Sequence, residues 1–248
     1  MLKLDYLRFA NEVFWVQGPR RLFSRVINVI LPNSGVTSAI RKSPSDYGIF
    51  LDIGAAFGHV TTEVSSRFAK CVCFEPSKEN YKQLLKNLER EKLNNVITYN
   101  CALGSRNETK RFFCSEDNPY DNRFSTDKEE KFTPYEVEVI RLDDVCEDLG
   151  IKERCVIKID VQGYELEVMQ GARKLLERDC RIISEFWPWG MYLHGTNPLE
   201  YVDFMMSMGY SFFELSGKRA SEKYVLHLCK LGKSKRHVWD DFLIKQPT

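Results

Sequence analysis

Residues 49–58 read Ile49-Phe50-Leu51-Asp52-Ile53-Gly54-Ala55-Ala56-Phe57-Gly58. An apolar run reaches the acid Asp52 and is followed by a turn through two glycines. A helix is expected from residue 59 to residue 68, directly after the second glycine. This order of strand, tight turn and helix is typical of a doubly wound α/β fold, which holds a nucleoside cofactor at such a turn. The stretch therefore predicts a nucleoside-binding domain.

A second acid follows the next apolar run of the chain. Glu75 comes directly after Cys71-Val72-Cys73-Phe74 and stands 21 residues beyond Gly54. A carboxylate in this position can accept hydrogen bonds from both hydroxyls of a ribose. The spacing strengthens the prediction of a nucleoside cofactor.

The glycine spacing indicates which cofactor this is. A dinucleotide fingerprint needs GxGxxG, whereas this chain has Gly54-x-Ala56-x-Gly58. Asp52, two residues before the first glycine, would repel a pyrophosphate and favour a cation. S-adenosylmethionine carries an ammonium group and a sulfonium and has no phosphate. The turn thus favours this methyl donor over NAD, with a purely structural turn as the remaining alternative.

Composition narrows the class of protein. The chain has 36 basic and 35 acidic residues, so no general basic field favours nucleic acid as a partner. Its eight cysteines form no CxxC pair, which argues against a zinc or redox site and fits a reducing cytoplasm. No apolar run approaches the ~20 residues that span a bilayer, and charged residues interrupt any signal-peptide core. We therefore expect a cytoplasmic protein without stable membrane insertion.

The chain divides into three parts. Residues 1–46 carry apolar residues at helical spacing and are expected to form a helical cap; weak docking on a membrane surface, aided by Arg20, Arg21 and Arg25, is the alternative. Residues 47–232 form the main domain and residues 233–248 a C-terminal tail. Within the domain, residues 106–140 are charged and broken by prolines, which predicts an inserted β-hairpin with a long tip.

Strands and helices alternate along the main domain. Strands are expected at 48–53, 70–75, 96–99, 155–160, 181–185, 211–215 and 224–231. Helices are expected at 59–68, 77–91, 142–149, 165–176 and 198–208. A mostly parallel seven-stranded sheet with helices on both faces is the natural closure of this pattern.

Several segments, taken in order, carry a family resemblance. They are Asp52–Gly58, Phe74-Glu75-Pro76, Asn100-Cys101-Ala102-Leu103-Gly104, Leu142-Asp143-Asp144, Lys158-Ile159-Asp160-Val161-Gln162-Gly163-Tyr164-Glu165, Gly171-Ala172 and Ile183-Ser184-Glu185. Over about residues 47–215 the chain resembles the FkbM-type methyltransferases, within the class I S-adenosylmethionine-dependent enzymes of Rossmann-like fold. Two positions depart from the family pattern: Ala56 stands where asparagine is usual, and Gln162 where glutamate is usual.

The resemblance implies a donor site. Gly54 and Gly58 would let the backbone approach the donor, Asp52 would hold its ammonium group directly or through water, and Glu75 would bind its ribose. The full set implied for the donor is Asp52, Gly54, Ala56, Gly58, Glu75, Pro76, Asn100, Cys101, Ala102 and Asp160. Asn100, Cys101 and Ala102 would flank the adenine edge.

Catalytic and acceptor residues are expected where later strands end. Asp160 follows the strand at 155–160 and is the first candidate for a general base, with His194 as the second. Glu185, with Trp187 and Trp189 beside it, suits an acceptor rich in hydroxyls, although a packed apolar lid explains the tryptophans almost as well. No metal is expected, the weak alternative being a hard-metal site at Asp160, Glu165 and Glu185.

The function expected by resemblance is O-methylation of a hydroxyl on a sugar, polysaccharide, glycolipid or polyketide-like metabolite. The partner is thus a small molecule or glycan, and the exposed edge of the inserted hairpin can pair between subunits as a homo-oligomer. Two alternatives from other classes are a catalytically inactive methyltransferase fold that serves as a binding or scaffold module, and an NAD-linked oxidoreductase.

Overall fold

A computed structural model of the chain describes residues 34–116, 118–125 and 132–247. Its strands are β1 (Ile49–Ile53), β2 (Lys70–Phe74), β3 (Val96–Tyr99), β4 (Ala102–Leu103), β5 (Glu108–Ser115), β6 (Phe132–Ile140), β7 (Cys155–Ile159), β8 (Arg181–Phe186), β9 (Ser211–Glu214) and β10 (Asp240–Lys245). Its α-helices are α3 (Ser34–Arg41), α4 (His59–Val64), α5 (Lys78–Arg90), α6 (Leu142–Asp148), α7 (Glu165–Gln170), α8 (Arg173–Leu176), α9 (Pro188–Leu193), α10 (Pro198–Ser207) and α11 (Glu222–Gly232), with a 3₁₀ turn at Ser65–Arg67 after α4.

Seven strands form one sheet in the order β3-β2-β1-β7-β8-β10-β9. The pairs from β3 to β8 are parallel, and only β10 runs antiparallel to its neighbours. Every residue of β1 and β7 is buried, because helices cover both faces of these central strands. The expected Rossmann-like α/β fold with a mostly parallel seven-stranded sheet is confirmed.

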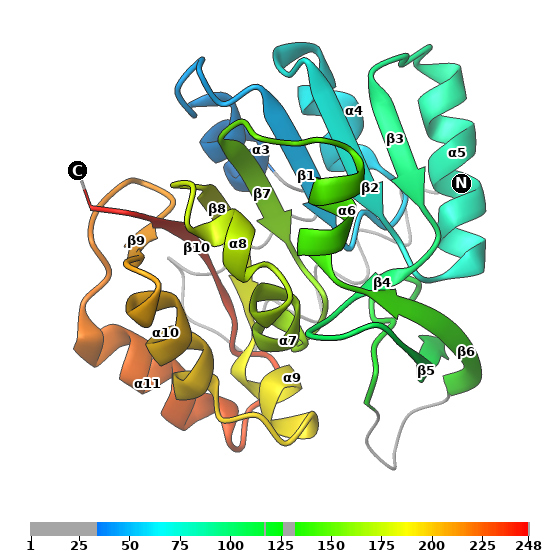
Figure 1. Cartoon of the computed structure of the whole chain (residues 1–248). Coiled ribbons are helices and arrows are strands. Elements are labelled where there is room, and N and C mark those ends of the chain that lie inside the picture. The colour runs from blue at the N-terminus through cyan, green and yellow to red at the C-terminus, as the bar shows by residue number, and fades with distance from the viewer. Residues whose placement is uncertain (1–33, 117, 126–131, 248) are drawn as a thin grey trace, which may run out of the picture.

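The two faces of the sheet have separate apolar layers. On one face, α6, α7, α8 and α10 pack on side chains that include Leu51 and Ile157. On the other face, α3 and α4 pack on Phe50 and Val156. Figure 1 shows α6, α7 and α8 in front of the sheet and α3 and α4 behind it. Consecutive strand residues thus serve opposite layers, as the alternation of side chains along a strand requires.

The strand expected at 224–231 is wrong. This segment belongs to α11, which Ser221 caps by accepting from the backbone N–H of Tyr224. Its buried residues, Val225, Leu228 and Cys229, are spaced three and four apart, as on a helix face. The seventh strand is β10, which lies in the segment expected to be a tail and is inserted between β8 and β9.

The helix expected at 165–176 is interrupted at Gly171, between α7 and α8. The Gly171 carbonyl accepts from the backbone N–H of Asp143, and a Cβ at this position would lie 2.0 Å from the Gly104 carbonyl oxygen. The close approach of the two backbones leaves no room for any other residue type.

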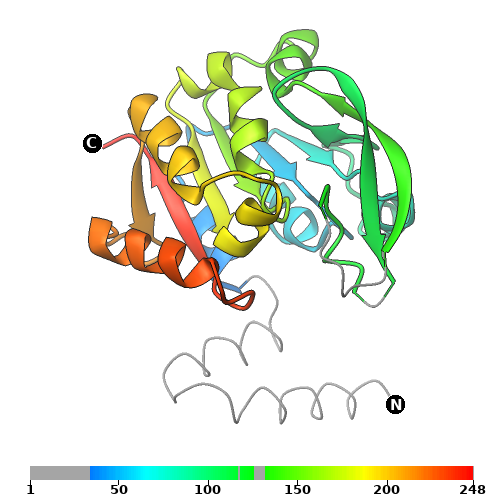
Figure 2. The same cartoon turned by 90° about the horizontal axis from the view of Figure 1, so that it is seen from below.

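The expected inserted hairpin is confirmed. β5 and β6 pair antiparallel, and β4 joins β6 to make a separate three-stranded sheet. Figure 2 shows these green strands beside the main sheet, at the end opposite the orange and red α11. The helical cap expected at 1–46 is described only at α3, and the alternative of docking through Arg20, Arg21 and Arg25 lies outside the described residues. Within the described ranges, no helix is both long and apolar enough to cross a bilayer.

Candidate functional site

The carboxyl ends of β1, β2, β7 and β8 meet at a cavity of about 200 Å³. Most of the residues predicted to hold the donor line it, and we call it the donor cavity after that prediction. Segments far apart in the chain contribute its walls: the glycine turn after β1, the end of β2, the loop after β7 and the inserted region. It is lined by Ile53, Gly54, Ala56, Phe74, Glu75, Pro76, Asn80, Cys101, Ala102, Leu103, Phe112, Pro119, Tyr120, Asn122, Phe124, Asp160, Val161, Gln162, Tyr164 and Glu185. This is the position at which open α/β sheets bind ligands.

The two glycines of the turn have different tasks. Gly54 lines the donor cavity with a φ of 75°, and a Cβ there would lie 1.9 Å from the Asp160 carbonyl oxygen. Gly58 also has a positive φ, of 77°, but it is not part of the cavity wall. A Cβ on Gly58 would lie 2.4 Å from Leu84 of α5. Gly54 therefore allows the loop after β7 to approach the turn, whereas Gly58 allows a helix to pack against it.

Glu75 joins this turn to the end of β2. Its Oε2 accepts from the backbone N–H of Ala56 at 2.8 Å, and its Oε1 accepts from that of Ser77 at 2.8 Å. Burial raises the pKa of Glu75 to about 7, and these two N–H donors oppose the rise. Each carboxylate oxygen retains a second lone pair for a ligand hydroxyl. Glu75 thus lies on the cavity wall, as a ribose-binding residue should. It also holds the backbone of the glycine turn and of Ser77, which the sequence did not predict.

The segment expected beside the adenine is only partly on the cavity wall. Cys101 and Ala102 line it together with Pro76, but Asn100 does not. The Asn100 amide instead donates to the carbonyl of Glu75 at 2.8 Å. Asn100 therefore supports the wall from outside.

Asp52 does not face the donor cavity. It is fully buried beneath the turn, where its Oδ2 accepts from the Thr61 hydroxyl at 2.6 Å and its Oδ1 lies 3.5 Å from Lys158 Nζ. Lys158 also donates to the Gly54 carbonyl at 2.7 Å. These contacts do not support the expected direct contact between Asp52 and an ammonium group, because the buried Lys158 already balances the charge of Asp52. The acids that do face the cavity are Glu75, Asp160 and Glu185.

Gln162 holds two of those acids. Its Nε2 donates to Asp160 Oδ1 at 2.8 Å and to Glu185 Oε2 at 3.0 Å. Burial and the nearby carboxylates of Asp160 and Asp241 raise the pKa of Glu185 well above its usual range. A glutamate at position 162 would bring a third carboxylate to this pair, whereas glutamine brings two N–H donors. Gln162 also has a φ of 54°, which is uncommon outside glycine and is found at functional sites.

His194 is not part of the donor cavity. Its ring packs against Tyr164 at a tilt of 54° with centroids 5.3 Å apart, and its Nε2 is buried with no hydrogen-bond partner among the described residues. Burial, Lys110 and Arg123 lower the pKa of His194 to about 3. An imidazole with this pKa is a weak base near neutral pH, so the prediction of His194 as a general base is not supported.

The tryptophans after β8 also lie outside the cavity wall. Trp187 is buried, and its Nε1 donates to the Arg236 carbonyl at 2.6 Å. The Nε1 of Trp189 is buried without a partner in the described part of the chain. The alternative of a packed apolar lid therefore fits Trp187. The aromatic wall of the cavity consists of Phe74 and Tyr164, from the segments that carry the resemblance, and of residues the sequence did not single out: Phe112, Tyr120 and Phe124.

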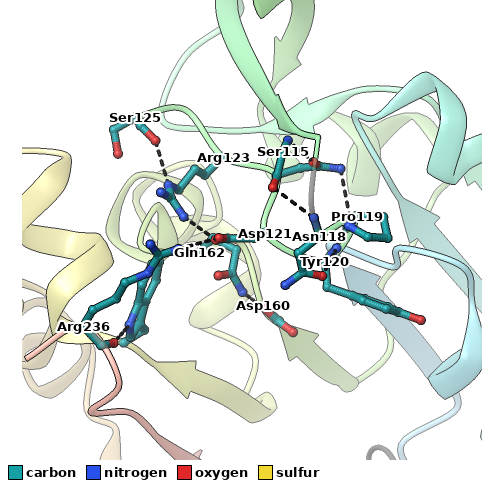
Figure 3. Close-up of polar contacts among 12 residues, drawn as sticks. Ser115, Asn118, Pro119, Tyr120, Asp121, Arg123, Ser125, Asp160, Gln162 and Arg236 are labelled. Atoms are coloured by element: carbon teal, nitrogen blue, oxygen red, sulfur yellow. Dashed lines mark hydrogen bonds and ion pairs between the residues drawn. The ribbon is translucent and has the colours of Figure 1, made fainter. Parts of the chain in front are cut away.

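Residues 118–125 of the inserted region lie over the donor cavity. Tyr120 packs against Phe57 of the glycine turn with centroids 5.0 Å apart, and Asn80 donates to the Pro119 carbonyl at 2.8 Å. Figure 3 shows Asp121 between Arg123 and Arg236, which it contacts as ion pairs. The buried Arg123 guanidinium also lies 5.6 Å from the centre of the Trp187 ring. The loop is thus fastened to the C-terminal part of the domain.

The site's buried acids predict an unusual pH dependence of stability. Burial raises the pKa of Glu75, Glu165 and Asp241 to about 7 from usual values of 4.5 or lower. Between the usual pKa values and a pH of about 7, these acids bind more protons in the folded state than in the unfolded state. The free energy of unfolding therefore falls as pH rises through this range. We expect the melting temperature of the ligand-free protein to be higher at pH 6 than at pH 8.

The control for this prediction is Glu165→Gln, which removes one of these titrations while keeping an acceptor for the N–H groups of Val161 and Gly163. It should flatten the pH dependence. His194 acts in the opposite direction, since its pKa is lowered, but only as pH falls through its usual value of 6.5. A melting temperature that rises steadily from pH 6 to pH 8 would contradict the assigned protonation of these acids.

The comparisons with known proteins agree with this geometry. A model of the family described as Methyltransferase FkbM domain matches residues 52–212, which is more than half of the chain. The chain belongs to the FkbM methyltransferase family. No curated protein matches the sequence.

One solved structure with a TM-score above 0.5 shares the fold of this FkbM methyltransferase. The methyltransferase FkbM from Methylobacillus flagellatus KT is 19% identical with a TM-score of 0.52, covering 87% of this chain but only 46% of that one. An O-methyltransferase from Bacillus cereus in complex with SAH is 14% identical with a TM-score of 0.49, covering 97% of this chain and 88% of that one. At these identities the likeness concerns the fold alone. The chain spans less than half the length of the M. flagellatus protein.

Within the described part of this FkbM methyltransferase, no three His, Cys, Asp or Glu side chains are arranged to hold a metal ion. The Glu165 carboxylate, one member of the weakly expected hard-metal set, accepts from the backbone N–H groups of Val161 and Gly163 instead. All eight cysteines are free thiols, and seven of them are buried.

Proposed function

We propose that this FkbM methyltransferase uses S-adenosylmethionine to methylate a hydroxyl oxygen of a sugar, polysaccharide, glycolipid or polyketide-like metabolite. The observation that carries the proposal is the donor cavity, where Glu75 stands on one side and the Asp160–Gln162–Glu185 group on the other. S-adenosylmethionine is a nucleoside with a cationic side chain. Its ribose would meet Glu75, and its positive charge would meet the Asp160–Gln162–Glu185 group. Eight free thiols support a reducing compartment, so we place the activity in the cytoplasm.

The residues fit the donor in three respects. Gly54 lies on the cavity wall and lets the Asp160 backbone approach the turn, since a Cβ there would lie 1.9 Å from the Asp160 carbonyl oxygen. Glu75 is held rigidly by two backbone N–H groups and retains lone pairs for ribose hydroxyls. Cys101, Ala102 and Phe74 offer an apolar wall at the end of β2 and β4 for a flat base. Here Asp52 acts through Lys158 on the turn rather than on the donor.

When bound, S-adenosylmethionine supplies a methyl group that its sulfonium has already activated. The protein then has to align an acceptor oxygen, exclude water and receive a proton. Asp160 is our candidate for the proton, because it lies on the cavity wall with one oxygen held by Gln162 and the other 3.8 Å from Lys158 Nζ. Glu185, whose pKa is raised by burial, can donate a hydrogen bond to an acceptor oxygen as a neutral acid.

The test combines binding and turnover. We expect S-adenosylhomocysteine to bind in calorimetry and NAD to give no heat, and we expect label from S-adenosylmethionine to pass to a hydroxyl compound in a panel of sugars, glycolipids and polyketides. Asp160→Asn should lower turnover at saturating S-adenosylmethionine by about 10²–10⁴-fold, as loss of a general base does. Asp144→Asn, on the exposed side of α6, is the matched control.

Three outcomes distinguish the alternatives for this protein. Binding of S-adenosylhomocysteine without transfer to any acceptor class would favour an inactive binding module. Binding of NAD in its place would favour an oxidoreductase. Methyl transfer to amines alone would support the methyltransferase activity but contradict the proposed O-methylation.

A further inference from the structure

One lysine lies between two carboxylates beside the glycine turn. Lys158 Nζ is 3.5 Å from Asp52 Oδ1 and 3.8 Å from Asp160 Oδ2. Asp52 is fully buried, whereas Asp160 lines the donor cavity. A single ammonium group cannot balance two carboxylates, so one negative charge is left over. Because Lys158 lies closer to Asp52, this charge remains on the acid that lines the cavity.

The other acids around this group are protonated more readily than usual. Burial and nearby carboxylates, that of Asp160 first among them, raise the pKa of Glu185 well above its usual range and that of Asp241 to about 7. Burial also raises the pKa of Glu75 and Glu165 to about 7. At pH 6.5 these acids, which come from β8, β10, α7 and the end of β2, are therefore mostly neutral.

Gln162 holds the two acids of the cavity wall in place. Its Nε2 donates to Asp160 Oδ1 at 2.8 Å and to Glu185 Oε2 at 3.0 Å, and an amide adds no charge of its own. The backbone beside it is tightly packed, because a Cβ on Gly163 would lie 2.3 Å from the carbonyl carbon of Gly190. Since Gln162 holds Oδ1, the Asp160 carboxylate is kept from turning this oxygen towards Lys158.

We propose that Asp160 is the unbalanced negative charge that this wall, as far as it is described, presents to the sulfonium of the donor. This charge favours the charged donor over its uncharged product, S-adenosylhomocysteine. Gln162 is the positioning residue that holds the charge, and Glu185 is its neutral neighbour. The inference rests on the proposed function, since it needs S-adenosylmethionine in the donor cavity.

A comparison of donor and product isolates the contribution of the sulfonium. S-adenosylhomocysteine lacks the methyl group and its positive charge but keeps the ammonium group, the carboxylate, the ribose and the base. Contacts to the shared parts therefore affect both dissociation constants, and the ratio of the two constants reports what the site does for the sulfonium. In a partly enclosed cavity, the attraction between two opposite unit charges changes an affinity by about tenfold or more.

Calorimetric titration of the full chain at pH 6.5 measures both dissociation constants. The decisive variant is Asp160→Asn/Glu185→Gln, which keeps the size of both side chains and removes the charge that Glu185 could supply once position 160 is neutral. We expect this variant to lower the preference for S-adenosylmethionine over S-adenosylhomocysteine at least about 10-fold. Glu185→Gln alone should change the preference less than about threefold, because Glu185 is already neutral.

Gln162→Met tests the positioning role, since methionine is unbranched and of similar length but has no N–H donor. Asp160 is then free to turn towards Lys158, so the preference for the charged donor should fall by about 3–10-fold. The matched control is Glu147→Gln/Asp148→Asn, which makes the same two exchanges on the exposed end of α6, outside the donor cavity. It should keep the wild-type ratio.

Each contrary result has a separate meaning. If neither compound binds the wild-type chain, the proposed function fails. If both bind and the variant Asp160→Asn/Glu185→Gln changes the two affinities equally or not at all, the acids do not serve the sulfonium and the inference is overturned. A ratio that Glu185→Gln alone lowers as far would place the charge on Glu185 instead of Asp160. A wild-type ratio in Gln162→Met would exclude the positioning role of Gln162.

Discussion

Replacing Glu75 by alanine is expected to weaken S-adenosylhomocysteine binding by about 100-fold or more. The substitution removes the acceptor for two backbone N–H groups, those of Ala56 and Ser77, and the acceptor proposed for the ribose. A buried donor left without a partner costs about 1–3 kcal/mol, and 1.4 kcal/mol corresponds to a tenfold change in affinity. Because Ala56 lies in the glycine turn, the variant disturbs both the ligand contact and the shape of the cavity.

Calorimetric titration at pH 8 measures this effect, since the raised pKa of about 7 leaves Glu75 mostly ionised there. Glu75→Gln keeps one oxygen as acceptor and should lose less affinity than Glu75→Ala. Glu79→Ala is the matched control, because Glu79 is an exposed acid in the first turn of α5 and faces no cavity. A Glu75→Ala protein that melts as wild type does and binds within threefold would exclude Glu75 from the donor site.

Replacing Lys158 by methionine is expected to lower the free energy of unfolding by about 3–5 kcal/mol, the usual cost of leaving a buried charge without its partner. Lys158 and Asp52 are both buried in the sheet beneath the glycine turn, and Asp52 would retain only its hydrogen bond from Thr61. Burial alone would lower the pKa of Lys158, but the carboxylates of Asp52 and Asp160 raise it overall, so the lysine is charged in the folded protein.

Urea unfolding at pH 7.5 measures the loss. The double variant Asp52→Asn/Lys158→Met should recover most of it, because replacing both members of a buried pair by neutral residues is often close to neutral. Lys174→Met is the matched control: its ion pair with Glu147 is exposed, and its loss should cost less than about 0.5 kcal/mol. A double variant no more stable than Lys158→Met would show that the lysine does not act through Asp52.

Local patterns predicted the elements that carry the donor site. The apolar run into Asp52, the two glycines and the run into Glu75 are each contiguous in sequence, and the structure has β1, the turn and β2 where these patterns predict them. The helix capped by Ser77 and the hairpin of β5 and β6 were found for the same reason. Prediction from local patterns failed at α11, because a short apolar run with charged neighbours fits the spacing of a helix as well as that of a strand.

Lysine in the otherwise apolar run of β7 was the one local signal that could have revealed the Asp52 pair, since a lysine in a fully buried strand needs a partner. Other site residues left no such signal. Tyr120 and Phe124 reach the donor cavity only because Asp121 meets Arg236, 115 positions later in the chain. Trp239 and Asp241 line a second cavity, of about 180 Å³ beside α3, only because β10 enters the sheet between β8 and β9.

The sequence by itself determined most of the strands and helices up to β9, the glycine turn and the acid at the end of β2, because these depend on neighbours along the chain. Only the tertiary structure decided that Asp52 faces Lys158 instead of the ligand, that Trp187 packs inside, and that Asp160 and Glu185 separate two cavities. The physical reason is that burial, charge pairing and cavity shape depend on which distant segments meet, and a pattern of residues along one segment does not contain that information.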